Sequence, residues 1–515
     1  MKSAVVVGIN LSMHFFITSI WLALFTMASQ NTFANRDQEQ GPQLTSAPPP
    51  EITKLASRYG LTVDSLSVCI AAIDSADKTL PTPDCYNQHT IFPLASVSKI
   101  LTAYYALSIL GFEYRFSTKI VSVGEVKDGV LLGDIYLQGG GDPLLGNDGL
   151  FELALRLKQL GISKVKGHFY YDDTLFSSKS EISNIGPGDQ TYNPGISALS
   201  SVFNRFTLGK EGGRATHNAT FTALPPLPSL QVVVSDKKFT LGKRFEYDWT
   251  AFPQEKWLLS TKEKYKHGEE IPVRNPSQYT AEIFALFCSQ VGLALTPPTR
   301  KKIPAISKTL FVVKSIPLQE IMRLTLEYSN NLLAEIILLM SSKTATGKDL
   351  SLNEAAREMI NWYKKQFPKI PWDEVQMVNG SGLTVENQAS SQLLTLLLKS
   401  LALPKNNNGP LLWPLLSLSG QNGWLKERFN SPSLFYKIWA KTGSLDYVSN
   451  IAGYLTTKSN KVFAFSILST DWKARDIIDK VGGEKGYKLT LKSGRFRDRT
   501  QIFAKELLAH WYETL

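Results

Sequence analysis

The spacing of hydrophobic residues along this chain changes twice, from helical to strand-like and then to a mixture of the two. An all-helical or all-strand fold therefore does not fit it. Residues 96–110 place apolar side chains at helical spacing and end at Gly111, which is typical of a helix C-terminus. Residues 206–259 consist mainly of short strand-like runs, and the last third returns to alternating helix and strand patterns. Because 515 residues are too many for one core, we expect roughly two to four domains with a separate, strand-rich middle.

Other segments carry the same two periodicities. Helical spacing predicts further helices over residues 150–160, 277–291, 317–327, 331–341 and 390–401, and from about residue 500. Strand patterns cover residues 66–74, 117–123, 130–139, 166–171, 438–440, 450–456 and 462–468.

Cysteine and histidine are scarce in this chain. It has 3 Cys and 6 His, with no Cys-x-x-Cys pair and no two His at the spacing of a helical metal site. We therefore expect neither a disulfide-dense scaffold nor a metal, and no cofactor.

The net charge of +11 suits an anionic partner, such as nucleic acid, a membrane surface or a polyanionic wall polymer. The densest basic run comprises Lys485, Lys488, Lys492, Arg495, Arg497 and Arg499. We interpret this run as a solvated surface loop, and the sequence leaves its role open.

Residues 1–34 have the pattern of a signal peptide. Lys2 is followed by an apolar run over residues 15–28, which is shorter than the roughly 20 residues that a membrane-spanning helix needs. Ala28 and Ala34 offer two cleavage sites, and an uncleaved signal anchor is the alternative. We expect an exported protein.

Residues 35–50 are polar and rich in proline, so we interpret them as a linker. In an exported protein, Cys69 and Cys85 could form a disulfide. A buried free thiol fits the apolar surroundings of Cys69 equally well.

The first chemical signal is Ser96 followed by Lys99 at the start of a predicted helix. Three residues apart, the two side chains share one helix face, and the helix start adds unpaired N–H groups. A hydroxyl, an amine base and an anion-stabilising field are what covalent acyl transfer requires. The same Ser-x-x-Lys spacing occurs elsewhere in the chain, so this motif alone is weak.

Two later motifs strengthen it. Ser329 and Asn331 lie between two predicted helices, and Lys441-Thr442-Gly443-Ser444 follows a predicted strand. Gly443 leaves the strand edge open for an extended substrate, and Lys441 can hold a terminal carboxylate. No Gly-x-Ser-x-Gly elbow and no phosphate-binding loop competes with this interpretation.

In this order, the three motifs make the chain similar to the serine-active penicillin-binding proteins. It most resembles the low-molecular-mass class C D-alanyl-D-alanine carboxypeptidases, the penicillin-binding protein 4 type. The separation of 233 residues between Ser96 and Ser329 (329 − 96) fits the domains that this class inserts there. Further matches lie at residues 139–143, 171–173, 332–335 and 380–383. Asn379 and Trp424 replace the usual Asp and Thr, and the tail beyond Asp471 matches poorly.

The resemblance implies an α/β (α+β) fold. A penicillin-recognising, β-lactamase-like domain with an antiparallel sheet and covering helices would comprise residues 51–114 and 305–515. One inserted domain would span residues 115–142 and 215–304, with a second domain nested in it at residues 143–214.

The resemblance also implies the role of each residue. Ser96 would be the nucleophile, Lys99 its base, Ser329 a proton relay and Asn331 an orienting group. The residues that would bind substrate are Lys441, Thr442, Gly443 and Ser444. The N–H groups of Ser96 and Ser444 would form the oxyanion hole. Burial and the charge of Lys441 would depress the pKa of Lys99. In an alternative register, Tyr328 would replace Ser329 as the proton shuttle.

The resemblance implies a periplasmic serine D-alanyl-D-alanine carboxypeptidase, and D,D-endopeptidase activity on cross-links is a further expectation. Its partners would be peptidoglycan peptides that end in D-Ala-D-Ala, with β-lactams as covalent inhibitors. The basic surface would contact the anionic envelope, and nucleic acid is not expected. A β-lactamase and a non-catalytic wall-binding protein are the competing hypotheses.

Overall fold

The computed structural model describes residues 47–73, 84–184, 188–213, 218–239, 241–403, 410–481 and 483–515. The predicted signal peptide and nearly all of the predicted linker lie outside these residues. All described residues belong to one compact unit, Ser46–Leu515. None of its described helices combines the length and the apolar character that crossing a bilayer requires.

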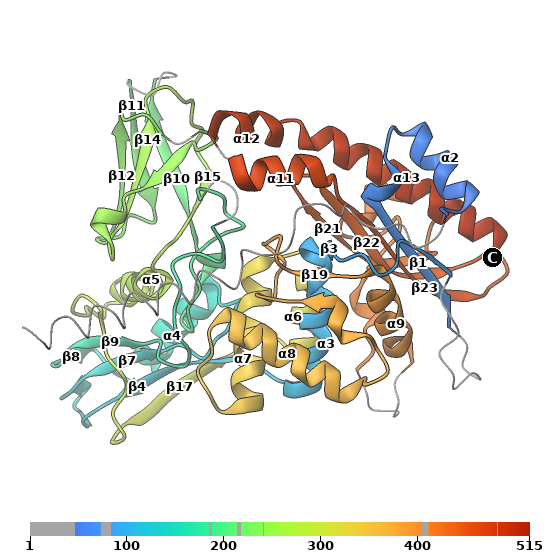
Figure 1. Cartoon of the computed structure of the whole chain (residues 1–515). Coiled ribbons are helices and arrows are strands. Elements are labelled where there is room, and N and C mark those ends of the chain that lie inside the picture. Colours follow the sequence, from blue (N-terminus) through green and yellow to red (C-terminus); the bar gives the residue numbers. More distant parts are fainter. Residues whose placement is uncertain are drawn as a thin grey trace, which may run out of the picture. The chain divides into compact units, whose positions relative to one another are not determined.

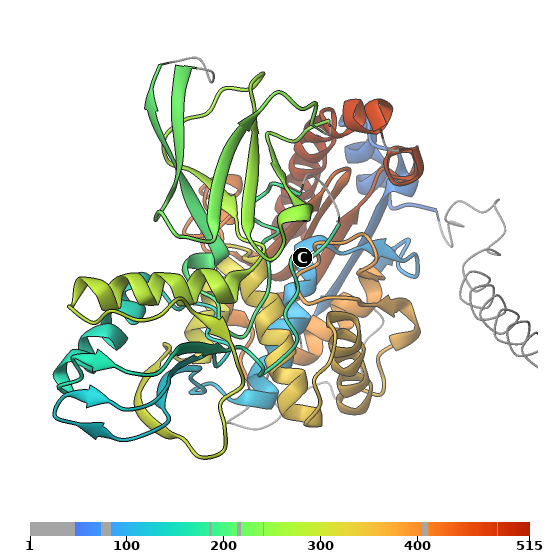
Figure 2. The same cartoon turned by 90° about the vertical axis from the view of Figure 1, so that its left-hand side faces the viewer.

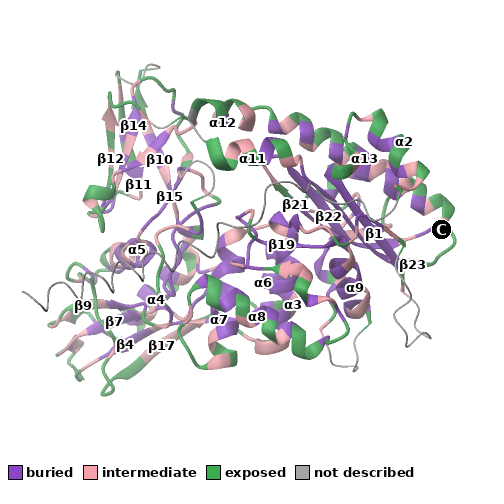
Figure 3. Ribbon diagram, viewed as in Figure 1, coloured by how far each residue is buried: buried purple, intermediate pink, exposed green. Residues whose placement is uncertain are grey.

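A six-stranded antiparallel sheet joins the two ends of this unit (Figure 1). Its strands, in spatial order, are β2 (Asp84–Tyr86), β1 (Leu66–Ala72), β23 (Val462–Ser469), β22 (Val448–Thr456), β21 (Ile438–Leu445) and β20 (Ser417–Leu418). Alternate residues of β22 pack on opposite faces: Ala452 and Tyr454 join one core, whereas Ile451 and Leu455 join another. This alternation buries both faces of the central strands (Figure 3).

Helices cover both faces of the six-stranded sheet. On one face, α9 (Ser391–Ala402) packs on β1 and β23, beside a cluster of four further helices. These four are α3 (Lys99–Leu110), α6 (Leu318–Glu327), α7 (Asn331–Thr346) and α8 (Leu352–Gln366). On the other face, α13 (Ser493–Thr514) packs on β22 and carries α2 (Pro50–Arg58) on its outer side (Figure 1).

The strand-rich middle of the chain forms its own layers (Figure 2). A five-stranded sheet has the order β16 (Thr299–Arg300), β9 (Phe169–Asp172), β7 (Ile135–Gln138), β4 (Ser117–Ser122) and β17 (Lys308–Lys314). The helices α4 (Asn147–Gln159) and α5 (Pro276–Gln290) pack on each other beside it. Two three-stranded sheets consist of β10 (Arg205–Gly212), β11 (Ala219–Leu224) and β15 (Glu269–Pro272), and of β12 (Leu230–Ser235), β13 (Phe245–Tyr247) and β14 (Glu255–Ser260).

Short elements complete the fold. Two small sheets contain β5 (Val126–Lys127), β6 (Val130–Leu131) and β8 (Lys164–Val165), and β3 (Phe92–Pro93), β18 (Val375–Gln376) and β19 (Gln388–Ala389). The remaining α-helices of the described residues are α10 (Leu425–Arg428), α11 (Trp472–Val481) and α12 (Gly483–Thr490). The strand β17 lies in the range predicted for the catalytic domain but pairs with β4 of the predicted inserted domain. The domain boundaries stay a prediction.

The basic run is helical, which corrects the interpretation of residues 485–499 as a loop. It spans α12 and the first turns of α13. The helix is favoured because Phe496, Phe503 and Leu507 recur at helical spacing and are buried against the sheet. Lys488 also pairs with Glu484 one turn before it.

The strand predicted over residues 130–139 is divided into β6 and β7. Gly133 lies between them, and a β-carbon there would be only 1.9 Å from the carbonyl oxygen of Val123. The chain therefore changes direction at a close backbone contact that only glycine permits.

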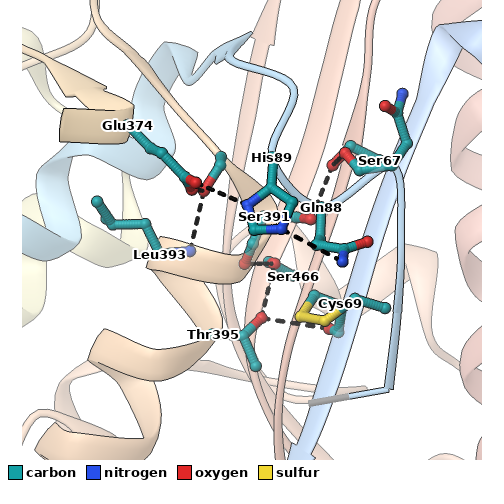
Figure 4. The surroundings of a disulfide bond; sticks show 12 residues. Ser67, Cys69, Gln88, His89, Glu374, Ser391, Leu393, Thr395 and Ser466 are labelled. Atoms are coloured by element: carbon teal, nitrogen blue, oxygen red, sulfur yellow. Dashed lines mark hydrogen bonds and ion pairs between the residues drawn. A yellow bond between two sulfur atoms is a disulfide. The ribbon is translucent and has the colours of Figure 1, made fainter. Parts of the chain in front are cut away.

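Cys69 and Cys85 form a disulfide between β1 and β2 (Figure 4). The sequence left open a disulfide or a buried free thiol at Cys69, and the structure has the disulfide. Hydroxyl groups around the bond link β1 and β23 to α9: Ser67 Oγ donates to Ser391 Oγ at 2.7 Å, and Thr395 contacts Ser466 at 2.8 Å.

Candidate active site

Ser96 lies in a tight turn where the chain enters α3. Residues Ala95–Ser98 form one 3₁₀ turn that continues directly into the helix. Ala95 has a φ of 48°, a backbone conformation that residues with a β-carbon rarely adopt. The buried Asn450 of β22 fixes this turn, because its Nδ2 donates to the carbonyl oxygen of Leu94 at 3.0 Å.

Lys99 occupies the first turn of α3, and its side chain is completely buried. Its Nζ lies 3.0 Å from Ser96 Oγ, 2.7 Å from Asn331 Oδ1 and 2.6 Å from the carbonyl oxygen of Ser381. The last two oxygens can only accept hydrogen bonds. A free amine has two hydrogens, which these two oxygens would take, so its lone pair would face the Ser96 hydroxyl.

Burial lowers the pKa of Lys99 to about 7, and the carboxylate of Glu335 acts in the opposite direction. The sequence predicted a depressed pKa from burial and from the charge of Lys441. Burial lowers the pKa of Lys99 as predicted. The repulsion between the two lysines, however, lowers the pKa of Lys441 and not that of Lys99. The pKa of Lys441 lies well below its usual value because of burial first, and then because of Lys99 and Arg428.

Glu335 connects α7 to the turn that holds Lys99. Its buried carboxylate accepts hydrogen bonds from the backbone N–H groups of Gly380 and Ser381, at 2.8 and 2.9 Å. The next peptide group supplies the Ser381 carbonyl to Lys99. Glu335 therefore orients the oxygen that anchors the amine and adds a negative charge behind it.

Ser329 lies in the connection between α6 and α7, with a φ of 56°. Lys441 Nζ donates to Ser329 Oγ at 2.9 Å and to the carbonyl oxygen of Thr442 at 2.7 Å. Asn331 opens α7, and its Nδ2 donates to the carbonyl oxygen of Tyr192 at 3.0 Å. The second and third motifs thus meet at a side-chain hydrogen bond.

The strand β21 carries Lys441, Thr442, Gly443 and Ser444 past the nucleophile turn. A β-carbon at Gly443 would be 2.7 Å from the carbonyl oxygen of Leu94 and 2.9 Å from the backbone nitrogen of Ser96. Glycine is thus required because the strand touches the backbone of the turn.

A cleft of about 610 Å³ opens above these groups. Five of the eight site residues named from the sequence line it: Ser96, Ser329, Asn331, Thr442 and Ser444. Lys99 and Lys441 lie beneath it with exposures of 0% and 2%, and each contacts one of the lining hydroxyl groups. The other lining residues are Tyr192, Tyr328, Gly382, Leu383, Trp424, Arg428, Leu445, Asp446, Arg475, Arg497, Asp498 and Gln501.

Tyr328, the alternative proton shuttle, also lines the cleft but is 66% exposed. Among the contacts of the described residues, the hydrogen bond to Lys441 is made by Ser329 and the one to Lys99 by Asn331. This geometry favours the register with Ser329 and Asn331.

Asn379 forms the hydrogen bonds that its turn needs. Its Oδ1 accepts from the N–H of Gly382 at 2.9 Å and from Nδ2 of Asn387 at 3.0 Å. The departure from Asp therefore leaves the turn closed, because the bonds use a side-chain oxygen that both residue types carry.

The sequence pointed to some of the additional site groups and missed others. Glu335 and Ser381 lie in matched motifs, but no role was assigned to them because their contacts are formed only by the folded chain. Tyr192, Arg428 and Asn450 carried no signal, since they come from segments without a motif. Among the described residues, no three His, Cys, Asp or Glu side chains gather as metal ligands.

The chain is similar to known carboxypeptidases. The profile of the D-Ala-D-Ala carboxypeptidase 3 (S13) family matches residues 64–483. D-alanyl-D-alanine carboxypeptidase DacB of Haemophilus influenzae is 25% identical over 426 residues, which cover 77% of this chain and 84% of that protein. A D-alanyl-D-alanine carboxypeptidase of Actinomadura sp. (strain R39) is 35% identical over 124 residues, or 22% of each chain.

The fold is also that of a solved relative. The crystal structure of penicillin binding protein 4 from Haemophilus influenzae superimposes with a TM-score of 0.72 at 21% identity, covering 90% of this chain and 99% of that one. The resemblance and the fold class predicted from the sequence are confirmed. Since the family profile spans more than half of its residues, the chain belongs to the D-Ala-D-Ala carboxypeptidase 3 (S13) family.

Proposed function

We propose that this chain hydrolyses the bond between two terminal D-alanines through an acyl-enzyme on Ser96. The observation that carries the proposal is the environment of Lys99. A buried amine with a pKa of about 7 has two of its three neighbours fixed as acceptors, so its lone pair is directed at Ser96 Oγ. This arrangement supplies a general base without histidine.

In the first step, Ser96 Oγ attacks the carbonyl carbon of the penultimate D-alanine and its proton passes to Lys99. The oxyanion would be held by the N–H groups of Ser96 and Ser444, and the close approach of β21 to the nucleophile turn supports this assignment. The proton then moves from Lys99 to the leaving amine, with Ser329 as relay. Lys441 Nζ donates to Ser329 and so orients it.

In the second step, water attacks the acyl-enzyme. Lys99 takes the proton of the water and returns it to Ser96 Oγ, which leaves as the alcohol, and the shortened peptide is released. Asn331 holds Lys99 in both steps and presents its side chain to the cleft.

The substrates that fit this site are peptidoglycan peptides with a D-Ala-D-Ala terminus. β-Lactams would acylate Ser96 and leave slowly. Export to the periplasm, peripheral contact with an anionic envelope and D,D-endopeptidase activity on cross-links belong to the same proposal. The basic residues of α12 and α13 support the proposed contact with the envelope.

The test is release of D-alanine from a purified pentapeptide muropeptide. Wild-type enzyme should release D-alanine, and Ser96→Ala should release none while unfolding at the same temperature. A cross-linked dimer in the same assay measures the endopeptidase activity. Equal release by Ser96→Ala would reject the mechanism.

A β-lactamase is the competing hypothesis. Rapid deacylation needs a group that activates water, and Glu335, the acid behind Lys99, is fully buried and already accepts two backbone N–H groups. We therefore expect slow β-lactam release. A non-catalytic wall-binding role would leave biological activity intact in Lys99→Ala, and we expect that activity to be lost.

A further inference from the structure

Arg428 is a cation in the cleft without a described partner. It ends the short helix α10 and lines the cleft with Trp424, Tyr328 and Thr442. Among the described residues, no carboxylate oxygen lies within 4.0 Å of its guanidinium, and the guanidinium donates no hydrogen bond. Burial lowers its pKa to about 10, and no acidic group offsets this effect.

The other two arginines of the cleft, Arg475 and Arg497, have different surroundings. Arg475 pairs with Asp479 and donates to the carbonyl oxygen of Asp446. Arg497, like Arg428, forms no ion pair among the described residues, but its sequence neighbour Asp498 lines the same cleft. Arg428 differs from both of them in lying close enough to Lys441 to lower the pKa of that lysine. Its side chain is partly exposed and lines the cleft, so an anionic group of a bound ligand can reach the guanidinium.

Lys441, to which the sequence assigned the substrate carboxylate, is already engaged. It is 2% exposed, and its Nζ donates to Ser329 Oγ and to the Thr442 carbonyl oxygen. Its pKa lies well below the usual value, partly because Arg428 is near. The two cations therefore share one side of the cleft, with the guanidinium at the cleft wall and the amine beneath it.

We propose that Arg428 binds the carboxylate of the leaving D-amino acid. The planar guanidinium would pair with both carboxylate oxygens, and the Thr442 hydroxyl would supply a further hydrogen bond. Lys441 would then act mainly on Ser329. This inference rests on the proposed function, because it specifies how that same site recognises the end of its substrate.

The experiment compares two matched thiolester substrates, one that ends in a free carboxylate and one in which that carboxylate is methyl-esterified. The variants are Arg428→Gln, Arg428→Lys and, as the matched control, Lys426→Gln on the same short helix. Lys426 is exposed and does not line the cleft. Each protein is characterised by its kcat/KM on both substrates.

We expect Arg428→Gln to lower kcat/KM for the carboxylate substrate by about 10- to 100-fold, the range of a charge-assisted hydrogen-bonded contact. For the same variant, kcat/KM for the ester substrate should change by less than about twofold. This small change would also show that the site is folded. Arg428→Lys should retain part of the preference for the carboxylate substrate over the ester, because it keeps the positive charge. Lys426→Gln should have the wild-type kcat/KM on both substrates.

An unchanged preference in Arg428→Gln, or an equal loss on both substrates, would overturn the role of Arg428 while the proposed function stands. Failure of the wild-type enzyme to turn over either substrate would overturn the proposed function and this inference together. The two failures are therefore distinguishable.

Discussion

Lowering the pH from 8 to 5 should slow acylation of Ser96 by nearly two orders of magnitude. With a pKa of about 7 for Lys99, the free amine makes up about 90% of the protein at pH 8 and about 1% at pH 5. The acylation rate should therefore fall roughly 90-fold across this interval if the free amine is the base. The fall should approach tenfold per pH unit below about pH 6.

Glu335→Gln tests the assignment of this titration to Lys99. The Glu335 carboxylate raises the pKa of Lys99. Its removal disfavours the ammonium form, so the pKa of Lys99 should fall and the acid limb should move to lower pH. Glu152→Gln is the matched control, because Glu152 is an exposed acid on α4, paired with Arg156.

The assay is stopped-flow measurement of acylation by a fluorescent penicillin, at half-unit pH intervals between 5 and 9, for wild type and both variants. The buffers are chosen so that unfolding, followed by intrinsic fluorescence, is absent throughout. A rate that is flat from pH 5 to 8 would refute the role of Lys99 as free-amine base. A limb that moves to higher pH in Glu335→Gln would refute the electrostatic reasoning.

Three further changes test the surrounding structure. Gly443→Val should abolish penicillin labelling, since its β-carbon would be 2.7 Å from the carbonyl oxygen of Leu94; normal labelling would contradict the close contact of β21. Asn379→Asp should keep D-alanine release within a few-fold of wild type, because Asn379 accepts both hydrogen bonds through Oδ1. Asn379→Ala should lose most of the D-alanine release. Equal rates in the two variants would contradict this role of Oδ1. Replacing Cys69 and Cys85 together by serine opens a loop with a sequence separation of 16, and urea denaturation should show a loss of about 3 kcal/mol in the free energy of unfolding; an unchanged value would show that the disulfide adds no stability.

The sequence predicted those parts of the site that depend on local spacing. Ser96 and Lys99 are three residues apart on one helix face, so their contact follows from helix geometry. The contact of Lys99 with Asn331 spans 232 residues and that of Lys441 with Ser329 spans 112. Only the resemblance to a family could place these residues together.

Groups that act through the folded backbone could not be predicted. The Ser381 carbonyl and the Asn450 amide belong to interactions that exist only after distant segments pack. The interpretation of the basic run failed for a related reason. Its charges suggested a solvated loop, whereas the buried positions Phe496 and Phe503 on the same segment determine a helix.

The most direct test of the central claim is to locate the covalent adduct. The protein is incubated with benzylpenicillin at pH 8, quenched in acid, digested and analysed by tandem mass spectrometry. We predict one penicilloyl group per chain, on the peptide that contains Ser96, and no adduct in Ser96→Ala. An adduct on Ser329 or on another residue, or unchanged modification of Ser96→Ala, would contradict the claim that Ser96 is the nucleophile activated by Lys99.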